Sequence, residues 1–174
     1  MTKTPIKIST LEEYINFDDG TDKQYELKDG VLVEMPPGTG KHEAIITLLL
    51  VRFFLEIQKM GLPLQPRPNG TEVLTNKQPR RPDICVITNQ QAQSIESTST
   101  ILKTAPPLLV EVVSSESVDR DNQKTSEYAA IGVVEYWIVD PLKNKLTVCL
   151  LDNSSYKQTV FTGISRLFLK LSQN

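Results

Sequence analysis

Three charged residues of the chain could together carry metal-dependent chemistry: Asp83, Glu111 and Lys124. Glu111 stands inside the apolar run Leu108 to Val113, where burying an unpaired carboxylate would be costly. A metal ion or a cationic side chain must therefore hold its charge. Asp83 begins a second apolar segment, and carboxylates at two strand ends supply the hard oxygen ligands that Mg²⁺ prefers. Lys124 could then orient a nucleophile or stabilise a developing anion.

These residues are positioned by a strand, helix and strand predicted within residues 106 to 141. The run Leu108 to Val113 is short and rich in β-branched residues, which favours a buried strand. A helical pattern follows from about Val118 to Ile131, and Gly132 ends it. Tyr136 to Val139 forms the second strand. Such a unit predicts a parallel strand pair joined by a right-handed crossover.

The same side chains admit a purely structural explanation. A buried carboxylate paired with a buried lysine can be a stabilising ion pair without any chemistry, and spacing alone does not separate the two cases. Glu26 is similarly ambiguous, because strand alternation predicts an exposed polar position while a carboxylate could also turn into a site. His42 is the only histidine and falls in a first helical turn, where the helix dipole predicts a lowered pKa. A lone histidine is more often a surface or capping residue than a catalyst.

The remaining pattern predicts a sequence of helices and hairpins. A short helix over Leu11 to Phe17, capped by Ser9 or Thr10, precedes a hairpin centred on Asp29-Gly30. The later elements are a helix from about Lys41 to Met60, a second hairpin pairing Leu64 to Arg67 with Thr71 to Thr75, a strand over Asp83 to Thr88, a polar loop with at most one helical turn over residues 89 to 105, and a meander over Lys145 to Leu151, Tyr156 to Phe161 and Leu167 to Leu171. The strands that hold Asp83, Glu111 and Tyr136 to Val139 should share one sheet, with the long helix packed on it.

Composition limits the possible classes of protein. The length of 174 residues suits one domain, residues 1 to 174, and 39% hydrophobic with 23% charged residues is typical of a soluble globular chain. With no long apolar segment and no signal-peptide pattern, we expect a cytoplasmic protein. A net charge of −2 gives no global attraction to nucleic acid, so any such binding needs a local patch or bound cations. Cys85 and Cys149 lack the spacing of a zinc site or disulfide scaffold and should be small buried hydrophobic residues.

Several motifs, taken together, resemble the Uma-two family of proposed restriction endonucleases, over roughly residues 10 to 170. They are Pro82-Asp83, EVVSSES beginning at Glu111, K-x-x-x-Y at Lys124 and Tyr128, GVVEYWIVDP from Gly132, and, upstream, YELKDGVLVEM with Tyr25, Glu26, Gly30 and Glu34, followed by a Pro-rich loop and His42. The family is similar to the PD-(D/E)xK nuclease superfamily. The resemblance implies an α/β (mixed α+β) fold with a restriction-endonuclease-like core, in which helices flank a central mixed sheet.

The resemblance also implies metal-dependent cleavage of phosphodiester bonds, with Asp83 and Glu111 as ligands of Mg²⁺ or of Mn²⁺ as its substitute. The superfamily lysine would stand at position 113, where this chain has Val113, so the family pattern supplies Lys124 from the following helix instead. Glu26 becomes an auxiliary carboxylate and His42 a possible auxiliary residue.

The partner implied by the resemblance is nucleic acid, in particular DNA. Cutting both strands of a duplex with one site per chain calls for a homodimer. Two other classes of function remain open, a catalytically inactive binding or dimerisation module with the nuclease fold, and a nucleotide or small-phosphoester hydrolase.

The position of Lys124 separates the catalytic expectation from solvent exposure. Lys124, Tyr128 and Ile131 fall on one side of the predicted helix, so a helix that packs through Tyr128 turns Lys124 toward the Glu111 strand. Its amine should then lie within a few Å of Asp83 and Glu111, whose charges would keep it protonated. In the alternative, Lys124 points into solvent on the opposite side.

Overall fold

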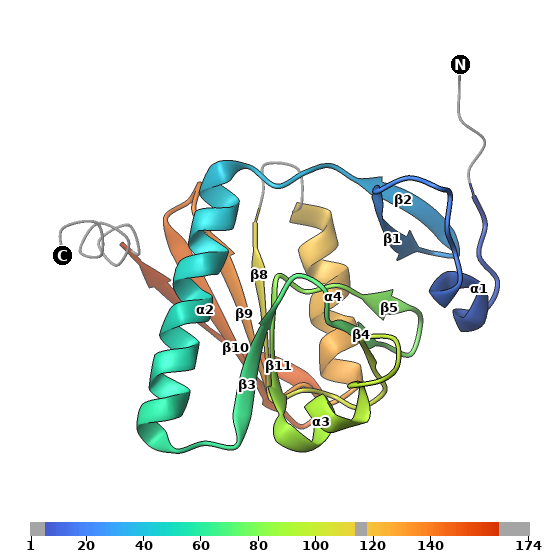
Figure 1. The fold of residues 1–174 in the computed structure, drawn as a ribbon. Helices are drawn as coiled ribbons and strands as arrows, with labels where there is room; N and C mark the ends of the chain where they lie inside the picture. Colours follow the sequence, from blue (N-terminus) through green and yellow to red (C-terminus); the bar gives the residue numbers. More distant parts are fainter. Residues whose placement is uncertain (1–5, 114–117, 164–174) are drawn as a thin grey trace.

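The computed structural model describes residues 6–113 and 118–163, and its side chains exclude those of residues 118–122 (Figure 1). It contains four helices and eleven strands within these residues. The helices are α1 (Leu11–Ile15), α2 (Gly40–Met60), α3 (Asn89–Ser94) and α4 (Val118–Ala130). The strands are β1 (Gln24–Lys28), β2 (Val31–Met35), β3 (Leu64–Pro68), β4 (Glu72–Leu74), β5 (Pro79–Arg80), β6 (Ile84–Thr88), β7 (Ile101–Leu102), β8 (Leu108–Val112), β9 (Glu135–Asp140), β10 (Lys145–Asp152) and β11 (Ser155–Thr162).

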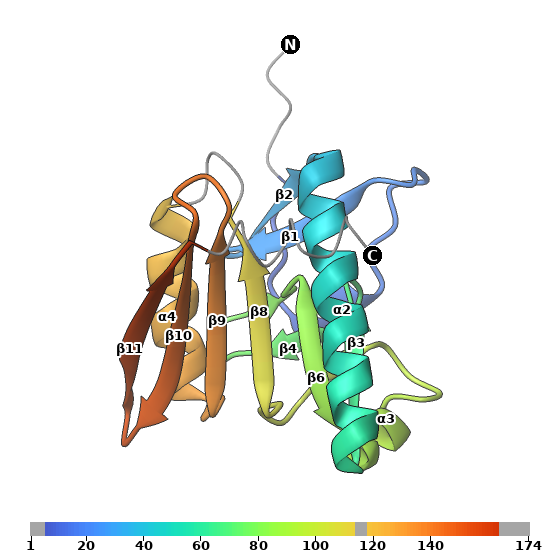
Figure 2. The ribbon, with the colours of Figure 1, turned by 90° about the vertical axis from the view of Figure 1, so that its left-hand side faces the viewer.

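A six-stranded sheet in the order β11-β10-β9-β8-β6-β3 forms the centre of the molecule. Its β8–β9 pair is parallel and its other pairs are antiparallel, so the sheet is mixed. Helix α2 covers one face and α4 the other (Figure 2). The predicted parallel pair on either side of α4 is therefore confirmed, as is the common sheet with the long helix packed on it.

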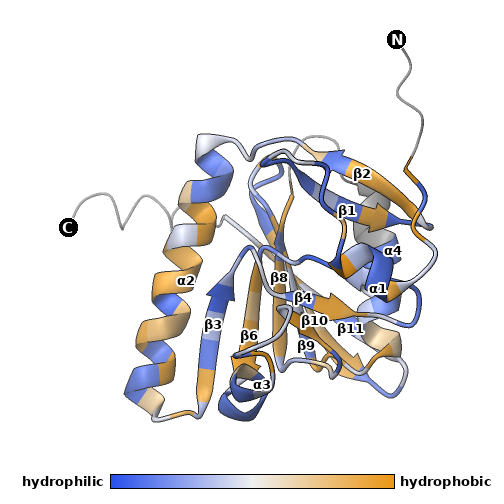
Figure 3. Cartoon of the chain, turned by 45° about the vertical axis from the view of Figure 1, so that its right-hand side comes forward, coloured by the Kyte–Doolittle hydropathy of each residue, from blue (hydrophilic) through white to orange (hydrophobic). Residues whose placement is uncertain are grey.

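Both faces of the central sheet are buried. On one face, Ile45 and Ile57 of α2 pack with Ile84 and Val110. On the other, Tyr128 of α4 belongs to a separate cluster of buried side chains. Because β6 and β8 are covered on both sides, they read as nearly continuous apolar runs. Figure 3 shows this difference between the mainly hydrophobic β6 and the mainly hydrophilic edge strand β3.

Two smaller sheets adjoin this core. The β1–β2 hairpin turns at Asp29 and Gly30, both with positive φ (49° and 77°), as the Asp-Gly signal predicts. The second predicted hairpin is wrong. Strand β3 pairs with β6, whereas β4 lies in a three-stranded sheet with β5 and β7. Pro66 and Pro68 lack backbone N–H groups, so β3 is suited to the edge of a sheet rather than to a full hairpin ladder.

The other predicted helices and strands hold with small changes of length, but the prediction of a loop over residues 89 to 105 is only partly right. The polar loop over residues 89 to 105 contains α3, capped by Thr88, and the two residues of β7. The β9–β10–β11 meander is confirmed, while the predicted segment Leu167 to Leu171 lies outside the described residues. Cys85 and Cys149 are free and buried, as expected. No helix in the described part of the chain is long and apolar enough to span a membrane.

Candidate active site

Asp83 and Glu111 come from neighbouring antiparallel strands. Ile84 of β6 lies opposite Val110 of β8, so the same register places Asp83 opposite Glu111. The Asp83 carboxylate also accepts a hydrogen bond from the backbone N–H of Val112, at 2.6 Å from Oδ2. The two carboxylates predicted from strand ends are therefore at the same end of the central sheet.

Lys124 reaches this end of the sheet from α4. Its side chain is buried, with Nζ 2.9 Å from Glu111 Oε1 and 3.7 Å from Glu26 Oε1. Tyr128, one turn further along α4, donates a hydrogen bond from its hydroxyl to the same Glu111 oxygen at 3.1 Å. The expectation that Lys124 and Tyr128 face the Glu111 strand is confirmed, and the solvent-exposed alternative is wrong.

Burial and charge set the protonation of this pair. Burial raises the pKa of Glu111 to about 7, and the Asp83 charge acts in the same direction, whereas Lys124 opposes the shift. Burial lowers the pKa of Lys124, but the Glu111 and Glu26 carboxylates outweigh it, so the pKa is raised overall. Lys124 is therefore protonated at neutral pH, as expected from its neighbours.

Glu26 enters the site from the separate β1–β2 sheet. It is only 6% exposed, so the exposed position predicted by strand alternation is wrong. Both Glu26 and the adjacent Leu27 are buried on β1. Glu26 is buried because the hairpin places it against two cations, Arg80 and Lys124. Its Oε1 lies 3.4 Å from an Arg80 guanidinium nitrogen and 3.7 Å from Lys124 Nζ. The structure thus brings Glu26 to the Glu111–Lys124 pair, as the family resemblance implied.

A buried ion pair between Arg80 and Glu127 adjoins these residues and was not predicted from the sequence. Arg80 donates from Nε and a terminal nitrogen to the two Glu127 oxygens, each at 2.8 Å, and Thr75 donates to Glu127 at 3.1 Å. A signal was present, since Glu127 lies three residues after Lys124 and therefore on the same side of α4. Arg80 touches both Glu26 and Glu127, so it joins the hairpin to α4.

His42 lies at the start of α2 and faces Asp83. Its Nε2 is 3.4 Å from Asp83 Oδ2, and its Nδ1 is 3.2 Å from Glu43 Oε1. The hydrogen bond to Asp83 raises the pKa of His42 to about 9 despite partial burial, and Glu43 adds to the shift. The predicted lowering of this pKa is therefore wrong, because the two nearby carboxylates raise it more than burial lowers it.

The two carboxylates at the sheet end fit Mg²⁺ in number and in chemistry. The described residues contain no group of three or more His, Cys, Asp or Glu side chains arranged to hold a metal. Mg²⁺ commonly uses one or two protein carboxylates and keeps several waters, so Asp83 and Glu111 still suit it. Within the described residues, the contacts of these carboxylates fall on Asp83 Oδ2 and Glu111 Oε1.

The described chain has a mixed six-stranded sheet with a helix on each face. The crystal structure of a "putative nuclease belonging to DUF820" from Anabaena variabilis ATCC 29413 has this fold, with a TM-score of 0.72 and 19% sequence identity. The match covers 90% of this chain and 84% of that chain. No curated protein matches the sequence.

The family is established by the sequence itself. Residues 11–170 match the model of the Uma2 family, described as "Putative restriction endonuclease". The chain therefore belongs to the Uma2 family, and that description places it among the nucleases in general.

Proposed function

We propose that the protein is a Mg²⁺-dependent endonuclease that hydrolyses phosphodiester bonds of DNA. The observation that supports this most is the buried Lys124 amine, which lies 2.9 Å from the Glu111 carboxylate. Glu111 in turn lies opposite Asp83 on the neighbouring strand. Two carboxylates and a charged lysine can bind a cation and a phosphate at one point. The family match supports the nuclease class independently of this geometry.

Each residue would have a separate task. Asp83 and Glu111 would hold the metal ion, and a bound Mg²⁺ supplies an activated water and stabilises the charge that develops on the phosphate. Lys124 would orient the attacking water or stabilise that charge through its ammonium group. Glu111 and, to a smaller extent, Glu26 keep Lys124 charged and fix its position. His42 holds the Asp83 carboxylate from the α2 side.

DNA as the substrate and a homodimer as the working form belong to the same proposal. The net charge of −2 provides little general attraction for a polyanion, so binding would depend on the metal and on local cations. One site per chain cuts one strand, and a two-fold dimer would supply the second site. Light scattering at tens of micromolar protein should give twice the chain mass, and a monomer under these conditions contradicts the dimer.

Cleavage of supercoiled plasmid DNA tests the proposed reaction. Mg²⁺ or Mn²⁺ should convert the plasmid to nicked and linear forms, and EDTA should prevent the conversion. Mononucleotides and a small phosphodiester tested in parallel distinguish a small-phosphoester hydrolase, which would act on these compounds and leave the plasmid intact. If neither substrate is cleaved with either metal, the activity is disproved and the non-catalytic binding or dimerisation module is favoured.

A further inference from the structure

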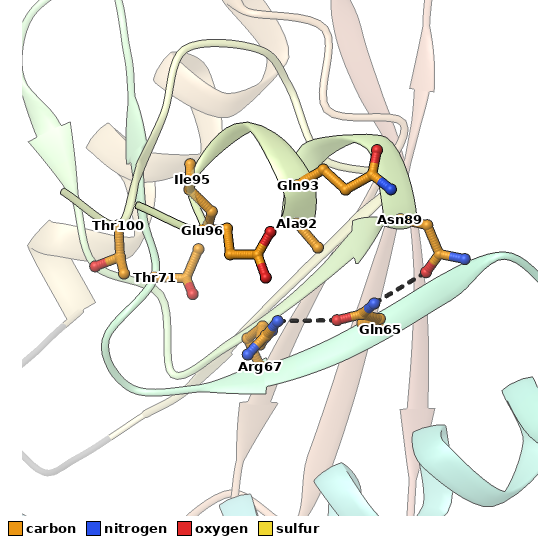
Figure 4. Close-up of a pocket in the computed structure, with 9 residues that line it drawn as sticks. All are labelled: Gln65, Arg67, Thr71, Asn89, Ala92, Gln93, Ile95, Glu96 and Thr100. Atoms are coloured by element: carbon orange, nitrogen blue, oxygen red, sulfur yellow. Dashed lines mark hydrogen bonds between the residues drawn. The ribbon is translucent and has the colours of Figure 1, made fainter. Parts of the chain in front are cut away.

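A pocket of about 570 Å³ lies between the edge strand β3 and the segment that contains α3 (Figure 4). Its volume falls within the range common for small-molecule and cofactor sites. The residues that line it do not include Asp83, Glu111, Lys124 or Glu26. The pocket is therefore a second candidate binding site of the chain.

The strand register places this pocket beside the carboxylates. Arg67 of β3 lies opposite Cys85, two residues along β6 from Asp83, so the side chains of Arg67 and Asp83 belong to the same face of the sheet. The backbone N–H of Asn69 donates to the Asp83 carbonyl, which continues the β3–β6 pairing up to Asp83. From standard strand dimensions, the Arg67 and Asp83 Cα atoms are about 9 Å apart. This separation is short enough for one nucleic-acid strand to reach both the pocket and the carboxylates.

Hydrogen bonds link several of the polar side chains of the pocket to one another. Arg67 donates to Gln65 Oε1 at 2.9 Å, and Gln65 donates to Asn89 Oδ1 at 3.0 Å, as the dashed lines in Figure 4 show. The Gln93 amide also lines the pocket, while Ala92 supplies an apolar surface. Amides and a guanidinium group beside apolar atoms suit the edge and face of a flat heterocycle.

The charges of the pocket argue against phosphate as its occupant. Arg67 contributes one positive charge and Glu96 one negative charge, so the lining is neutral overall. Among the described residues, no ion pair joins Arg67 to Glu96, and Figure 4 shows the Glu96 carboxylate directed into the pocket from the segment after α3. The Arg67 guanidinium, a hydrogen-bond donor, and the Glu96 carboxylate, an acceptor, therefore line the same pocket.

Guanine matches this arrangement better than the other bases. Its O6 and N7 atoms accept hydrogen bonds from an arginine, and its N1–H and N2–H groups can donate to a carboxylate. Guanine alone has two acceptor atoms on one edge and two donor atoms on another, whereas adenine, cytosine and thymine each lack one of these pairs. A base in an intact duplex is stacked, so only an unpaired or extruded base can enter the pocket.

We infer that the pocket lined by Arg67, Gln65, Asn89 and Glu96 binds an unpaired guanine close to the phosphate to be cleaved on the same strand. The inference rests on the proposed nuclease function for the position of the base along the substrate. Recognition of the base itself depends on the pocket alone. The site would therefore favour cleavage near guanine in single-stranded or locally opened nucleic acid.

A nucleotide titration followed by NMR tests binding without any cleavage. The full ¹⁵N-labelled chain in EDTA is titrated separately with dGMP, dAMP, dCMP and dTMP, and the side-chain amide signals of Gln65 and Asn89 are monitored. Saturable shifts should occur with dGMP at about tenfold lower concentration than with the other three, the discrimination expected of one bidentate contact to a base. Equal responses to all four nucleotides, or no saturable response, would overturn the inference.

Matched variants assign the preference to the pocket. Arg67→Met and Glu96→Gln should each reduce dGMP affinity about tenfold, because each removes one side of the recognition. Arg52→Met removes the same charge from the exposed part of α2 and should leave affinity unchanged. An equal loss in Arg67→Met and Arg52→Met overturns the assignment.

Plasmid cleavage separates this inference from the proposed function. Guanine-dependent shifts in a chain that cleaves no phosphodiester would support the pocket and refute the nuclease. Metal-dependent cleavage without guanine-dependent shifts would do the reverse.

Discussion

The Lys124 ammonium lies 2.9 Å from the Glu111 carboxylate, although the two residues belong to different elements, α4 and β8. Position 113, where the superfamily pattern has a lysine, holds a buried valine whose backbone N–H donates to Val139 at 2.7 Å. The strand therefore continues its pairing with an apolar side chain at this position. The positive charge comes instead from Lys124 of α4, whose ammonium group reaches the Glu111 carboxylate.

Replacing Lys124 tests whether this charge participates in cleavage. Lys124→Met keeps most of the packing of the side chain and removes the ammonium group. We expect cleavage to fall at least 100-fold, because the charge at the phosphate is lost, while Mn²⁺ binding measured by calorimetry is retained. Lys157→Met, on exposed β11, is the matched control and should cleave normally. Unchanged cleavage by Lys124→Met would remove this residue from the mechanism.

Asp83→Asn and Glu111→Gln test the metal ligands with nearly unchanged side-chain volume. Each substitution removes a charged oxygen ligand, so Mn²⁺ affinity measured by calorimetry should fall at least tenfold, and the double variant should show no measurable binding. Asp152→Asn, at the exposed β10–β11 turn, serves as the control. Mn²⁺ affinity equal to that of the wild type in the double variant would show that these residues are not the ligands.

The Arg80–Glu127 pair should contribute strongly to stability. Glu127→Gln leaves the buried Arg80 undercompensated, so we expect unfolding free energy at pH 7 to fall by about 3–5 kcal/mol in urea titrations. Glu56→Gln, whose partner Lys59 is exposed, should change it by at most about 1 kcal/mol. Comparable losses in the two variants would mean that the buried pair has no special role.

The difference in unfolding free energy between the wild type and Glu127→Gln should depend on pH, because the Arg80–Glu127 pair depends on the charge of Glu127. Burial raises the pKa of Glu127, but Arg80 outweighs it and leaves the pKa lowered in the folded chain. The stabilisation is therefore complete above the unfolded pKa of about 4.3 and is lost as the pH falls through the lower folded value. Urea titrations between pH 7 and pH 3 should show the difference narrowing below pH ~4. A difference that is constant over this range would contradict the assignment.

Two glycines at opposite ends of α2 should respond to alanine in opposite ways. Gly61 ends the helix with φ 62°, so Gly61→Ala should lower unfolding free energy by about 1 kcal/mol. Gly40 begins the helix without a positive φ, and a methyl group added at its Cα would meet no atom within 4 Å, so Gly40→Ala should raise it by roughly 0.4–1 kcal/mol. Thermal unfolding of the two variants measures both effects, and a shift of the same sign in each would contradict the helix boundaries.

Local signals were sufficient for most of the fold. Asp29-Gly30 predicted its hairpin because both residues accept positive φ, and Gly61 and Gly132 correctly marked helix ends. The failure at β3 has a different origin. Strand partners are chosen over the whole sheet. Pro66 and Pro68 indicate an edge strand, but nothing in residues 64 to 75 indicates that its partner is β6 rather than β4.

The candidate site was predictable where one residue conflicted with its surroundings. Glu111 in an apolar strand required a partner, and Lys124 on the next helix supplied it. Glu26 and Arg80 were harder, because their burial depends on the contact of the separate hairpin with α4. The pKa of His42 was mispredicted because Asp83, which sets it, lies 41 residues away in sequence (83 − 42) and is brought near only by folding.

The prolines of β3 make the two edge strands of the central sheet, β3 and β11, differ in their ability to pair with a further strand. Pro66 and Pro68 remove two N–H donors from the five residues of the β3 margin, which makes it a poor template for an added strand. The β11 margin has eight residues without proline, and Val160 and Phe161 are exposed there. Any lateral growth of the sheet, whether orderly pairing of chains or unwanted aggregation, is therefore directed to β11, and the margin beside Arg67 remains open to ligands.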